Sequence, residues 1–167
     1  MKRILVVEDE ASIRELVALN LKMTGWEVLE APSAERALEL IQKNPPCDVA
    51  LLDIMLPGMD GFSLCETIRH GDPYIGIIMA SAKGQESDKI RGLSIGADDY
   101  ICKPYDIDIL IAKINGIFKR KYALDEIVCD NLKLNNVTQT LTVNQTPVNV
   151  TEKEFQLLKL LVENKGT

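Results

Sequence analysis

Acidic residues follow two of the short apolar segments in this sequence. The segment "ILVVEDE" ends in Glu8, Asp9 and Glu10, and "LLDIMLPGMDG" places Asp53 at the end of another apolar run. Carboxylates that converge on one crevice repel each other unless a cation lies among them. Mg²⁺ suits such a site because it binds through one or two carboxylates, with carbonyl and water oxygens completing its shell. The spacing therefore predicts a magnesium site.

Two further side chains follow apolar segments and complete a chemical set. Ser81 ends "IIMAS" and Lys103 precedes a proline in "DYICKP". A lysine ammonium can meet phosphate oxygens, and the hydroxyl and nearby backbone amides can do the same. These groups are typical of phosphoryl transfer. The sequence has no glycine-rich nucleotide cradle, so the predicted acceptor is a protein carboxylate, and Asp53 is the natural nucleophile.

Each of these residues also has a simpler structural explanation. Asp9 and Glu10 could cap a helix and interact favourably with its dipole. Asp53 could be a solvated residue before the turn "PGMDG", and Lys103 before Pro104 could be purely structural. The simpler explanations do not account for the fact that all these groups follow predicted strands.

Short apolar segments alternate with amphipathic ones over the first 120 residues. The predicted strands are "RILVVE", "WEVLEA", "DVALLD", "IGIIMA" and "DYIC", and the predicted helices lie near residues 10–24, 34–44, 61–70, 85–95 and 107–120. Several strands are continuous apolar runs, as parallel strands buried on both faces require. Five such units predict an α/β fold with a doubly wound five-stranded parallel sheet. The functional groups of such a sheet gather at the carboxyl ends of its strands.

The pattern changes after Lys121. Between residues 127 and 150, short β-type runs are separated by the turn signals "NN" and "NQTP", which predicts a small antiparallel sheet. A helix follows, with Thr151 and Glu154 spaced as a capping box. Its apolar residues cover more than one side: Phe155, Leu157, Leu158, Leu160, Leu161 and Val162. The predicted domains are residues 1–121 and 127–167, with a linker at 122–126.

Composition excludes several classes of protein. The 167 residues are 46% hydrophobic and 26% charged, which is ordinary for a globular protein, and no apolar run reaches the length of a membrane span. The four cysteines form no CxxC pair, which favours a reducing, cytoplasmic location. The only histidine, His70, lies in the loop-like "IRHGDP", which argues against a histidine-rich metal site. A net charge of −6 argues against a preformed nucleic-acid surface.

The segments "ILVVEDE", "LLDIMLPGMDG", "IIMASA" and "GADDYICKPY" together resemble the receiver (CheY-like) domain of two-component response regulators, over residues 1–121. The segment "VNVTEKEFQLLKLLVENKGT" resembles the beginning of a winged-helix effector of the OmpR/PhoB type. This resemblance implies that Asp53 is the phosphoacceptor. It also implies that Mg²⁺ is bound by Asp9, Asp53 and the Met55 carbonyl, with Glu8 acting through water.

The same resemblance assigns roles to further residues. Lys103 pairs with the phosphoryl group, and the peptide bond between Lys103 and Pro104 is expected to be cis. Ser81 turns to hydrogen-bond a phosphoryl oxygen, and the Tyr100 side chain then moves inward. The implied partners are a sensor histidine kinase and, after phosphorylation, a second copy of the chain. The expected protein is a phosphoacceptor that assists its own phosphorylation and dephosphorylation, not a conventional enzyme. The charged residues expected on the dimer face are Lys89, Arg91, Asp98, Asp99, Lys113 and Arg120.

Two departures from the family pattern modify these expectations. The family's second effector helix, recognition helix and wing do not follow, so we expect a truncated or naturally short effector that contacts DNA only through the missing part. Residues 122–167 contain four lysines, no arginine and six acidic residues, a poor footprint for DNA. Ile109 stands where the subfamily usually has a glutamate that pairs with the residue at Arg91, which predicts a weaker dimer.

Two other functions stay open at this point. A flavodoxin-like redox protein would share the fold, although Glu8, Asp9 and Glu10 would repel a flavin phosphate; absorbance near 450 nm would reveal it. A phosphorylation-independent, receiver-like interaction module would usually have lost the acceptor or the lysine.

Two residues near the predicted acceptor concern the lifetime of the phosphoryl group. Met55 lies two residues after Asp53, and Lys83 lies two residues after Ser81. Both flank the route of an attacking water, and we expect them to influence that lifetime.

Overall fold

The computed structural model describes residues 2–82, 90–92, 94–124, 126–136 and 138–164. The chain divides into two compact units, Met1–Phe118 and Lys119–Thr167. No helix among the described residues is long and apolar enough to cross a membrane.

The first unit contains the predicted five-stranded parallel sheet, in the order β2-β1-β3-β4-β5. Its strands are β1 (Arg3–Val7), β2 (Glu27–Ala31), β3 (Val49–Asp53), β4 (Gly76–Ala82) and β5 (Asp99–Lys103). The central strand β3 is buried along its whole length, as its uninterrupted apolar sequence requires. The doubly wound α/β fold predicted from the sequence is therefore confirmed.

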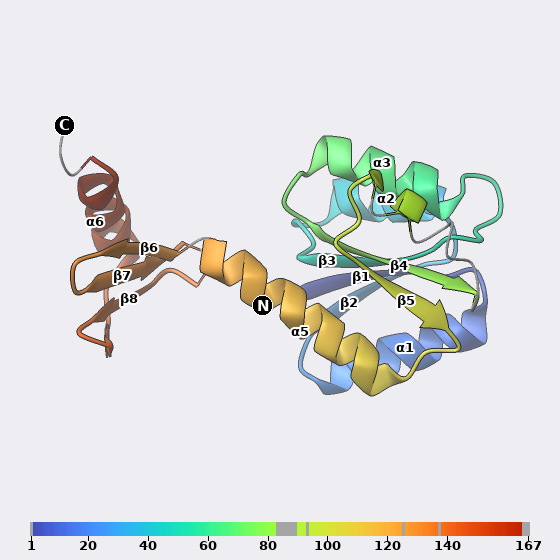
Figure 1. Ribbon diagram of the computed structural model, residues 1–167, viewed down its shortest axis with the longest axis horizontal. Helices are drawn as coiled ribbons and strands as arrows, with labels where there is room; N and C mark the ends of the chain where they lie inside the picture. Colours follow the sequence, from blue (N-terminus) through green and yellow to red (C-terminus); the bar gives the residue numbers. More distant parts are fainter. Residues whose placement is uncertain (1, 83–89, 93, 125, 137, 165–167) are drawn as a thin grey trace. The chain divides into compact units, whose positions relative to one another are not determined.

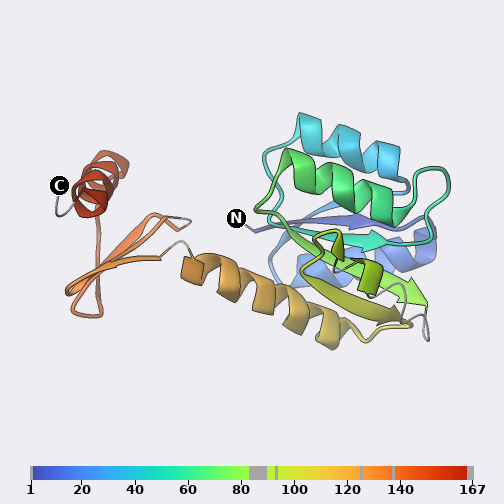
Figure 2. The same ribbon diagram turned by 45° about the horizontal axis from the view of Figure 1, so that its top comes forward.

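Helices cover both faces of this sheet. In Figures 1 and 2, α2 (Ala34–Lys43) and α3 (Gly61–Gly71) lie on one face, and α1 (Ala11–Met23) and α5 (Ile107–Leu124) lie on the other. The helix predicted at 85–95 falls largely outside the described residues, although 90–92 and 94 are helical. The sequence predicted His70 in a loop, and this prediction is wrong. His70 lies in the last turn of α3, where its Nδ1 lies 2.8 Å from the Glu66 carbonyl oxygen.

Local signals in the sequence define several helix ends. The Ser33 hydroxyl accepts a hydrogen bond from the Arg36 amide at 3.2 Å and so caps α2, as predicted. After α1 the backbone of Gly25 has φ +84°, a left-handed conformation that glycine adopts without strain. These caps fix where the loops around the sheet begin and end.

The segment predicted as a linker, 122–126, is mostly regular structure. Helix α5 continues to Leu124, and β6 (Glu126–Cys129) begins two residues later. The helix continues because the sequence "KRKYAL" consists largely of good helix formers and lacks glycine and proline. The division between the two units lies after residue 118, and the domain limits at 121 and 127 stay a prediction.

The main core of the first unit packs the sheet against α2 and α3. Leu5, Leu52, Leu64, Ile77 and Met79 are fully buried there. Burying one such side chain stabilises the fold by about 1.5–3 kcal/mol. The sheet is thus a rigid base for the loops at its carboxyl edge.

The second unit is a four-stranded antiparallel sheet with one helix. The sheet has the order β6-β7-β8-β9, with β7 (Leu132–Asn135), β8 (Thr140–Val143) and β9 (Thr146–Val148), and α6 (Glu152–Glu163) follows it. The Thr151 amide donates to the Glu154 carboxylate at 2.7 Å, and the Glu154 amide donates back to the Thr151 hydroxyl. The predicted capping box is therefore confirmed.

The two sides of α6 differ in their surroundings. Phe155 is buried against Leu134 and Leu141 of the small sheet. Leu157, by contrast, is 58% exposed, and Leu160 is 59% exposed. One apolar side of the helix therefore packs on the sheet, while the other faces outward in this chain.

Candidate functional site

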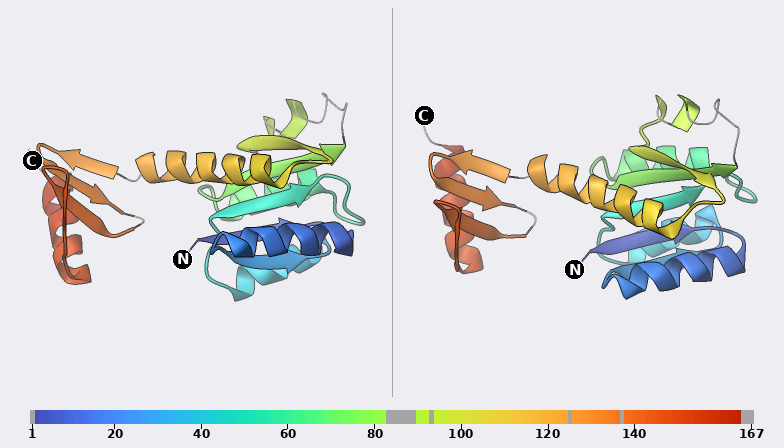
Figure 3. Two further views of the ribbon diagram at one scale, coloured as in Figure 1. Left: turned by 90° about the horizontal axis from the view of Figure 1, so that it is seen from below. Right: turned by 60° about the horizontal axis from the view of Figure 1, so that its bottom comes forward.

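Three carboxylates converge at the carboxyl edge of the parallel sheet. Glu8 follows β1 directly, and Asp53 is the last residue of β3; Figure 3 shows that these strands run in the same direction. Carboxylate oxygens of Glu8, Asp9 and Asp53 all lie within 4.8 Å of one another. Glu8 and Asp53 are buried, whereas Asp9 is exposed. Buried carboxylates need a positive partner, because each loses its hydration.

Lys103, at the end of β5, supplies that positive charge. Its Nζ donates to Glu8 Oε2 at 2.5 Å and to Asp53 Oδ2 at 2.7 Å. The peptide bond between Lys103 and Pro104 is cis, as the resemblance implies. Burial alone would lower the pKa of Lys103, but the hydrogen bonds to Asp53 and Glu8 outweigh it and raise the pKa. The lysine is therefore held in its charged form.

Burial has the opposite effect on the acid beside it. Desolvation raises the pKa of Glu8, and the nearby charge of Asp53 raises it further, while the hydrogen bond from Lys103 opposes the shift. Burial also raises the pKa of Tyr105, to about 12, so its phenol stays neutral. The site thus combines excess negative charge with a low-dielectric surrounding, which favours binding of a cation.

The loop after β3 holds Asp53 in place. The Met55 amide donates to Asp53 Oδ1 at 3.1 Å, and the Met55 side chain is 68% exposed. Gly61 opens α3 directly against this loop: a Cβ there would lie 2.1 Å from the Asp53 carbonyl oxygen. Asp60 caps α3 by accepting from the Ser63 amide at 2.8 Å. Sequence reasoning treated "PGMDG" as a turn and did not identify the close approach of Gly61.

The loop after β1 is held by a residue that sequence reasoning missed. Arg14 of α1 donates to the backbone carbonyl of Glu8 at 2.7 Å and to that of Asp9 at 3.3 Å. Glu10 is the N-cap residue of α1, but its side chain makes no capping hydrogen bond. Arg14 thus holds the backbone that carries Glu8 and Asp9. The Glu10 side chain does not cap α1 in this structure.

The two residues predicted to act as switches, Ser81 and Tyr100, lie on strands β4 and β5. Asp53 pairs in register with Ala80, and Ser81 is the next residue of β4. The Ser81 hydroxyl is buried and donates to the Ala82 carbonyl at 3.0 Å. Tyr100 pairs in register with Met79 on the neighbouring strand, and its hydroxyl oxygen is buried. Ser81 thus lies one residue beyond the register partner of Asp53, and Tyr100 lies one strand further away.

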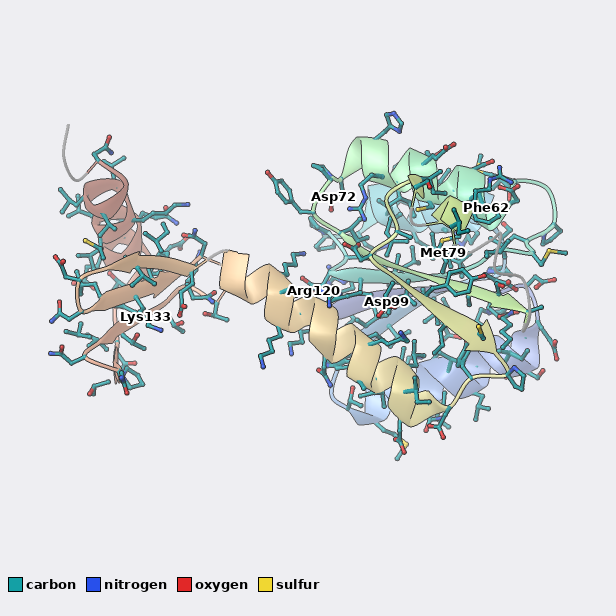
Figure 4. The ribbon with its side chains drawn as sticks, viewed as in Figure 1. Phe62, Asp72, Met79, Asp99, Arg120 and Lys133 are labelled. Atoms are coloured by element: carbon teal, nitrogen blue, oxygen red, sulfur yellow. The ribbon has the colours of Figure 1, made fainter. Side chains whose placement is uncertain are left out.

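Three of the residues expected on a dimer face, Asp98, Asp99 and Lys113, form ion pairs within the chain. Asp98 accepts from Arg69 of α3 at 2.9 Å, and Asp99 accepts from Lys113 of α5 at 2.8 Å. Arg120 lies on the exposed side of α5, and Figure 4 labels it together with Asp99.

The structure describes one of the two other residues of that expected face, Arg91. Arg91 lies over the ring of Phe62, 4.3 Å from its centroid. Lys89 lies outside the described residues, as does Lys83.

The donor set fits Mg²⁺. The cluster offers three carboxylates, all hard oxygen ligands. Its formal charge from Glu8, Asp9, Asp53 and Lys103 is −2, which a divalent cation would neutralise. Sulfur and histidine ligands, which softer metals prefer, do not contribute to this cluster of described residues.

A doubly wound parallel sheet whose carboxyl edge carries an acidic cluster bridged by a lysine defines the class of response regulator receiver domains. Residues 4–115 match the family described as "Response regulator receiver domain". The chain belongs to this family, and its relatives place it among the OmpR/PhoB-type regulators of two-component systems.

Particular relatives match nearly the whole chain. The chain is 41% identical to the regulatory protein VanR of Enterococcus faecium, over 98% of this chain and 74% of VanR. It is 37% identical to the phosphate regulon transcriptional regulatory protein PhoB of Pseudomonas aeruginosa, over 98% of this chain and 73% of PhoB.

Solved structures agree with this placement. The response regulator DrrB of Thermotoga maritima, described as an OmpR/PhoB homologue, is 27% identical with a TM-score of 0.65, over 100% of this chain and 75% of DrrB. A receiver domain from Methanospirillum hungatei is 32% identical with a TM-score of 0.70, over 74% of this chain and 98% of that chain. Membership of this family excludes the flavodoxin-like redox protein. The phosphorylation-independent module therefore stays as the one alternative to the predicted phosphoacceptor.

Proposed function

We propose that this response regulator accepts a phosphoryl group on Asp53 from a sensor histidine kinase, with Mg²⁺ bound, and thereby controls transcription. The observation that carries the proposal is the position of Lys103, whose ammonium bridges Glu8 and Asp53 at 2.5 and 2.7 Å. A half-buried lysine between two buried acids is an arrangement that a purely structural module does not need.

The proposed chemistry is a direct phosphoryl transfer. A carboxylate oxygen of Asp53 attacks the phosphorus, and the bond from phosphorus to the imidazole nitrogen of the donor breaks, leaving its electron pair on the imidazole. Lys103 then donates a hydrogen bond to a phosphoryl oxygen instead of to Asp53 Oδ2. The Met55 amide, already directed at Asp53 Oδ1, stabilises the charge that develops.

The metal would be held by residues of the carboxylate cluster. Asp9, Asp53 and the Met55 carbonyl are the proposed direct ligands, and Glu8 would act through a bound water. When bound, Mg²⁺ neutralises charge on the phosphoryl oxygens and on the carboxylates. The exposure of Asp9, beside the buried Glu8 and Asp53, supports a site that the ion can enter from solvent.

The proposed response passes through Ser81 and Tyr100. The Ser81 hydroxyl would turn from the Ala82 carbonyl to a phosphoryl oxygen, and Tyr100 would adjust beside it. This local change would favour a symmetric dimer through the surface that carries Arg91, Asp98, Asp99, Lys113 and Arg120.

We expect this dimer to be weak. Asp98 and Asp99 already have partners within the chain, and Ile109 is 53% exposed where a charged partner was expected. Exposed ion pairs contribute about 0–1 kcal/mol each. Sedimentation velocity should show a monomer without phosphorylation and partial dimerisation with it; a tight dimer in both conditions would point to another interface.

Beryllium fluoride, which with Mg²⁺ mimics a carboxyl-bound phosphoryl group, tests the switch. We expect amide chemical shifts of Ser81 and Tyr100 to change in the wild-type chain and not in Asp53→Asn. If the shifts do not change in the wild type, the chain is instead the phosphorylation-independent interaction module that the sequence left open.

A further inference from the structure

A pocket of about 620 Å³ lies at the amino edge of the parallel sheet. Its walls include Cys47, which precedes β3, and Ile75, which precedes β4. Asp53 is the last residue of β3, so the pocket and the proposed phosphoacceptor lie at opposite ends of the same strand. The pocket is therefore separate from the carboxylate cluster.

The C-terminal halves of two helices form the sides of this pocket. Leu38 and Ile41 of α2 line it, and Ile68 of α3 lies among the facing residues. With Cys47 and Ile75, these side chains give the pocket a mainly apolar interior. A pocket of this volume has room for a small organic molecule, and an apolar lining favours a ligand with an apolar body.

A single ionised group stands in these apolar walls. Asp72, labelled in Figure 4, is the only charged side chain among the described residues that line the pocket. Its Oδ1 accepts from the Tyr74 amide at 2.8 Å and from the Ile75 amide at 3.2 Å, which fixes the carboxylate just after α3. The C-terminal ends of α2 and α3 add partial negative charge. The pocket therefore combines an apolar interior with a negative potential.

Basic side chains around the pocket do not neutralise this charge from within it. No lysine, arginine or histidine is among the described residues that line the pocket. Three basic side chains of the adjoining segments form ion pairs with other acids: Arg3 with Glu27, Lys43 with Glu39, and Arg69 with Asp98. The pocket thus favours a positively charged ligand over a negatively charged one of the same shape.

We propose that this pocket binds a small amphipathic cation, an apolar ring or short chain that carries one protonated amine. The apolar part lies between α2 and α3, and the ammonium pairs with the Asp72 carboxylate. Removal of apolar surface from water drives binding, while the carboxylate selects the charge of the ligand. The inference does not depend on the proposed phosphorylation of Asp53.

Cys47 provides a reporter inside the pocket. Burial raises the pKa of the Cys47 thiol to about 11, and burial likewise raises the pKa of Cys65 to about 11. The two thiols therefore have similar thiolate fractions, but Cys47 lines the pocket and Cys65 does not. A small thiol reagent, methyl methanethiosulfonate, should modify Cys47 about tenfold faster than Cys65, because reactivity then depends on access.

Tryptamine and indole-3-propionate are suitable probes, because they share an indole ring and a two-carbon chain and carry opposite charges. Amide chemical shifts would follow each titration in excess Mg²⁺, so that the carboxylate cluster is occupied and cannot bind the ammonium. We expect tryptamine to shift the amides of Thr67 and Gly71 and to bind about tenfold more tightly than indole-3-propionate, the effect of one charge-assisted contact. Tryptamine should also slow the modification of Cys47 and leave that of Cys65 unchanged.

Asp72→Asn is the decisive variant, because its side-chain oxygen can still accept from the Tyr74 and Ile75 amides while the charge is lost. We expect it to weaken tryptamine binding about three- to tenfold and not to weaken indole-3-propionate binding. The matched control is Asp108→Asn, which removes an exposed acid of α5 on the other face of the sheet. It should change tryptamine binding by less than about twofold.

Four results would overturn the inference. They are equal affinity for the two probes, binding of neither probe, equal effects of Asp72→Asn and Asp108→Asn on tryptamine, and equal protection of the two thiols. Each readout is independent of phosphorylation, so failure of the proposed function would leave this test intact.

Discussion

Replacing Lys103 by methionine removes the one positive charge that contacts both buried acids among the described residues, while keeping a side chain of similar length. The Lys103 side chain is 22% exposed, and those of Glu8 and Asp53 are each 5% exposed. Breaking a buried ion pair by removing one partner costs about 3–5 kcal/mol, because the remaining charge is left without compensation. We expect about 3 kcal/mol here, at the lower end, since the partial exposure of Lys103 lets water enter the gap.

Urea denaturation at pH 7.5 without Mg²⁺ is the appropriate assay. With a slope of about 1–3 kcal/mol per molar urea, the expected loss lowers the midpoint by about 1–3 M. Lys113→Met is the matched control, because it breaks a 2.8 Å ion pair to Asp99 between side chains that are 29% and 28% exposed. That pair should contribute less than about 1 kcal/mol. If both variants lose the same small free energy, Lys103 is not the counter-charge that we infer.

The free energy of unfolding that Lys103→Met loses should depend on pH in a definite direction. Burial already raises the pKa of Glu8, and loss of Lys103 should raise it further. A carboxyl whose folded-state pKa is raised binds its proton more tightly when folded. That contribution to stability is full below the unfolded pKa of about 4.3 and is lost as pH rises through the folded pKa. The deficit of Lys103→Met should therefore shrink from pH 8 to pH 5, and Mg²⁺ should also reduce it by binding the folded state. A deficit that grows on acidification would refute the reasoning.

Three further changes test other parts of the structure. Gly61→Ala should cost about 1–3 kcal/mol, because its Cβ would lie 2.1 Å from the Asp53 carbonyl, whereas Gly71→Ala, with open space around it, should be nearly neutral in denaturation. Met55→Asn should shorten the half-life of the phosphorylated chain several-fold, because an amide can orient the attacking water and an exposed methionine cannot; an unchanged or longer half-life, followed by intact mass, would count against it. Phe155→Ala should cost the second unit about 3–5 kcal/mol and abolish hydrogen-exchange protection in α6. Leu157→Ala, at a position 58% exposed, should leave that protection within about 0.5 kcal/mol, and equal losses would mean that the helix does not pack as described.

Local sequence signals predict much of this fold because they act over a few residues. Ser33 caps α2 and Thr151 caps α6, because each hydroxyl accepts a hydrogen bond from the backbone amide three residues later. The spacing of residues in the sequence is enough to predict such a cap. The site could be anticipated for a related reason: parallel strands bring their carboxyl ends to one edge, so Glu8, Asp53 and Lys103 had to be neighbours.

Contacts between distant side chains could not be predicted in the same way. Asp98 accepts a hydrogen bond from Arg69, 29 residues earlier, and Arg91 lies over the ring of Phe62; neither contact was predicted. A sequence pattern gives the face on which a residue lies, but its partner depends on tertiary packing. The continuation of α5 to Leu124, within the segment expected as a linker, was missed for another reason: the change in pattern after Lys121 was given more weight than the helix propensity of "KRKYAL".

The most direct test of the central claim is the intact mass of the chain after incubation with a phosphoryl donor. With acetyl phosphate and Mg²⁺, the wild-type chain should gain the mass of one phosphoryl group, about 80 Da, as expected for a single aspartyl phosphate. The gain should disappear in Asp53→Asn and when EDTA removes the metal. A gain of the same mass in Asp53→Asn, or one that EDTA does not affect, would contradict the account.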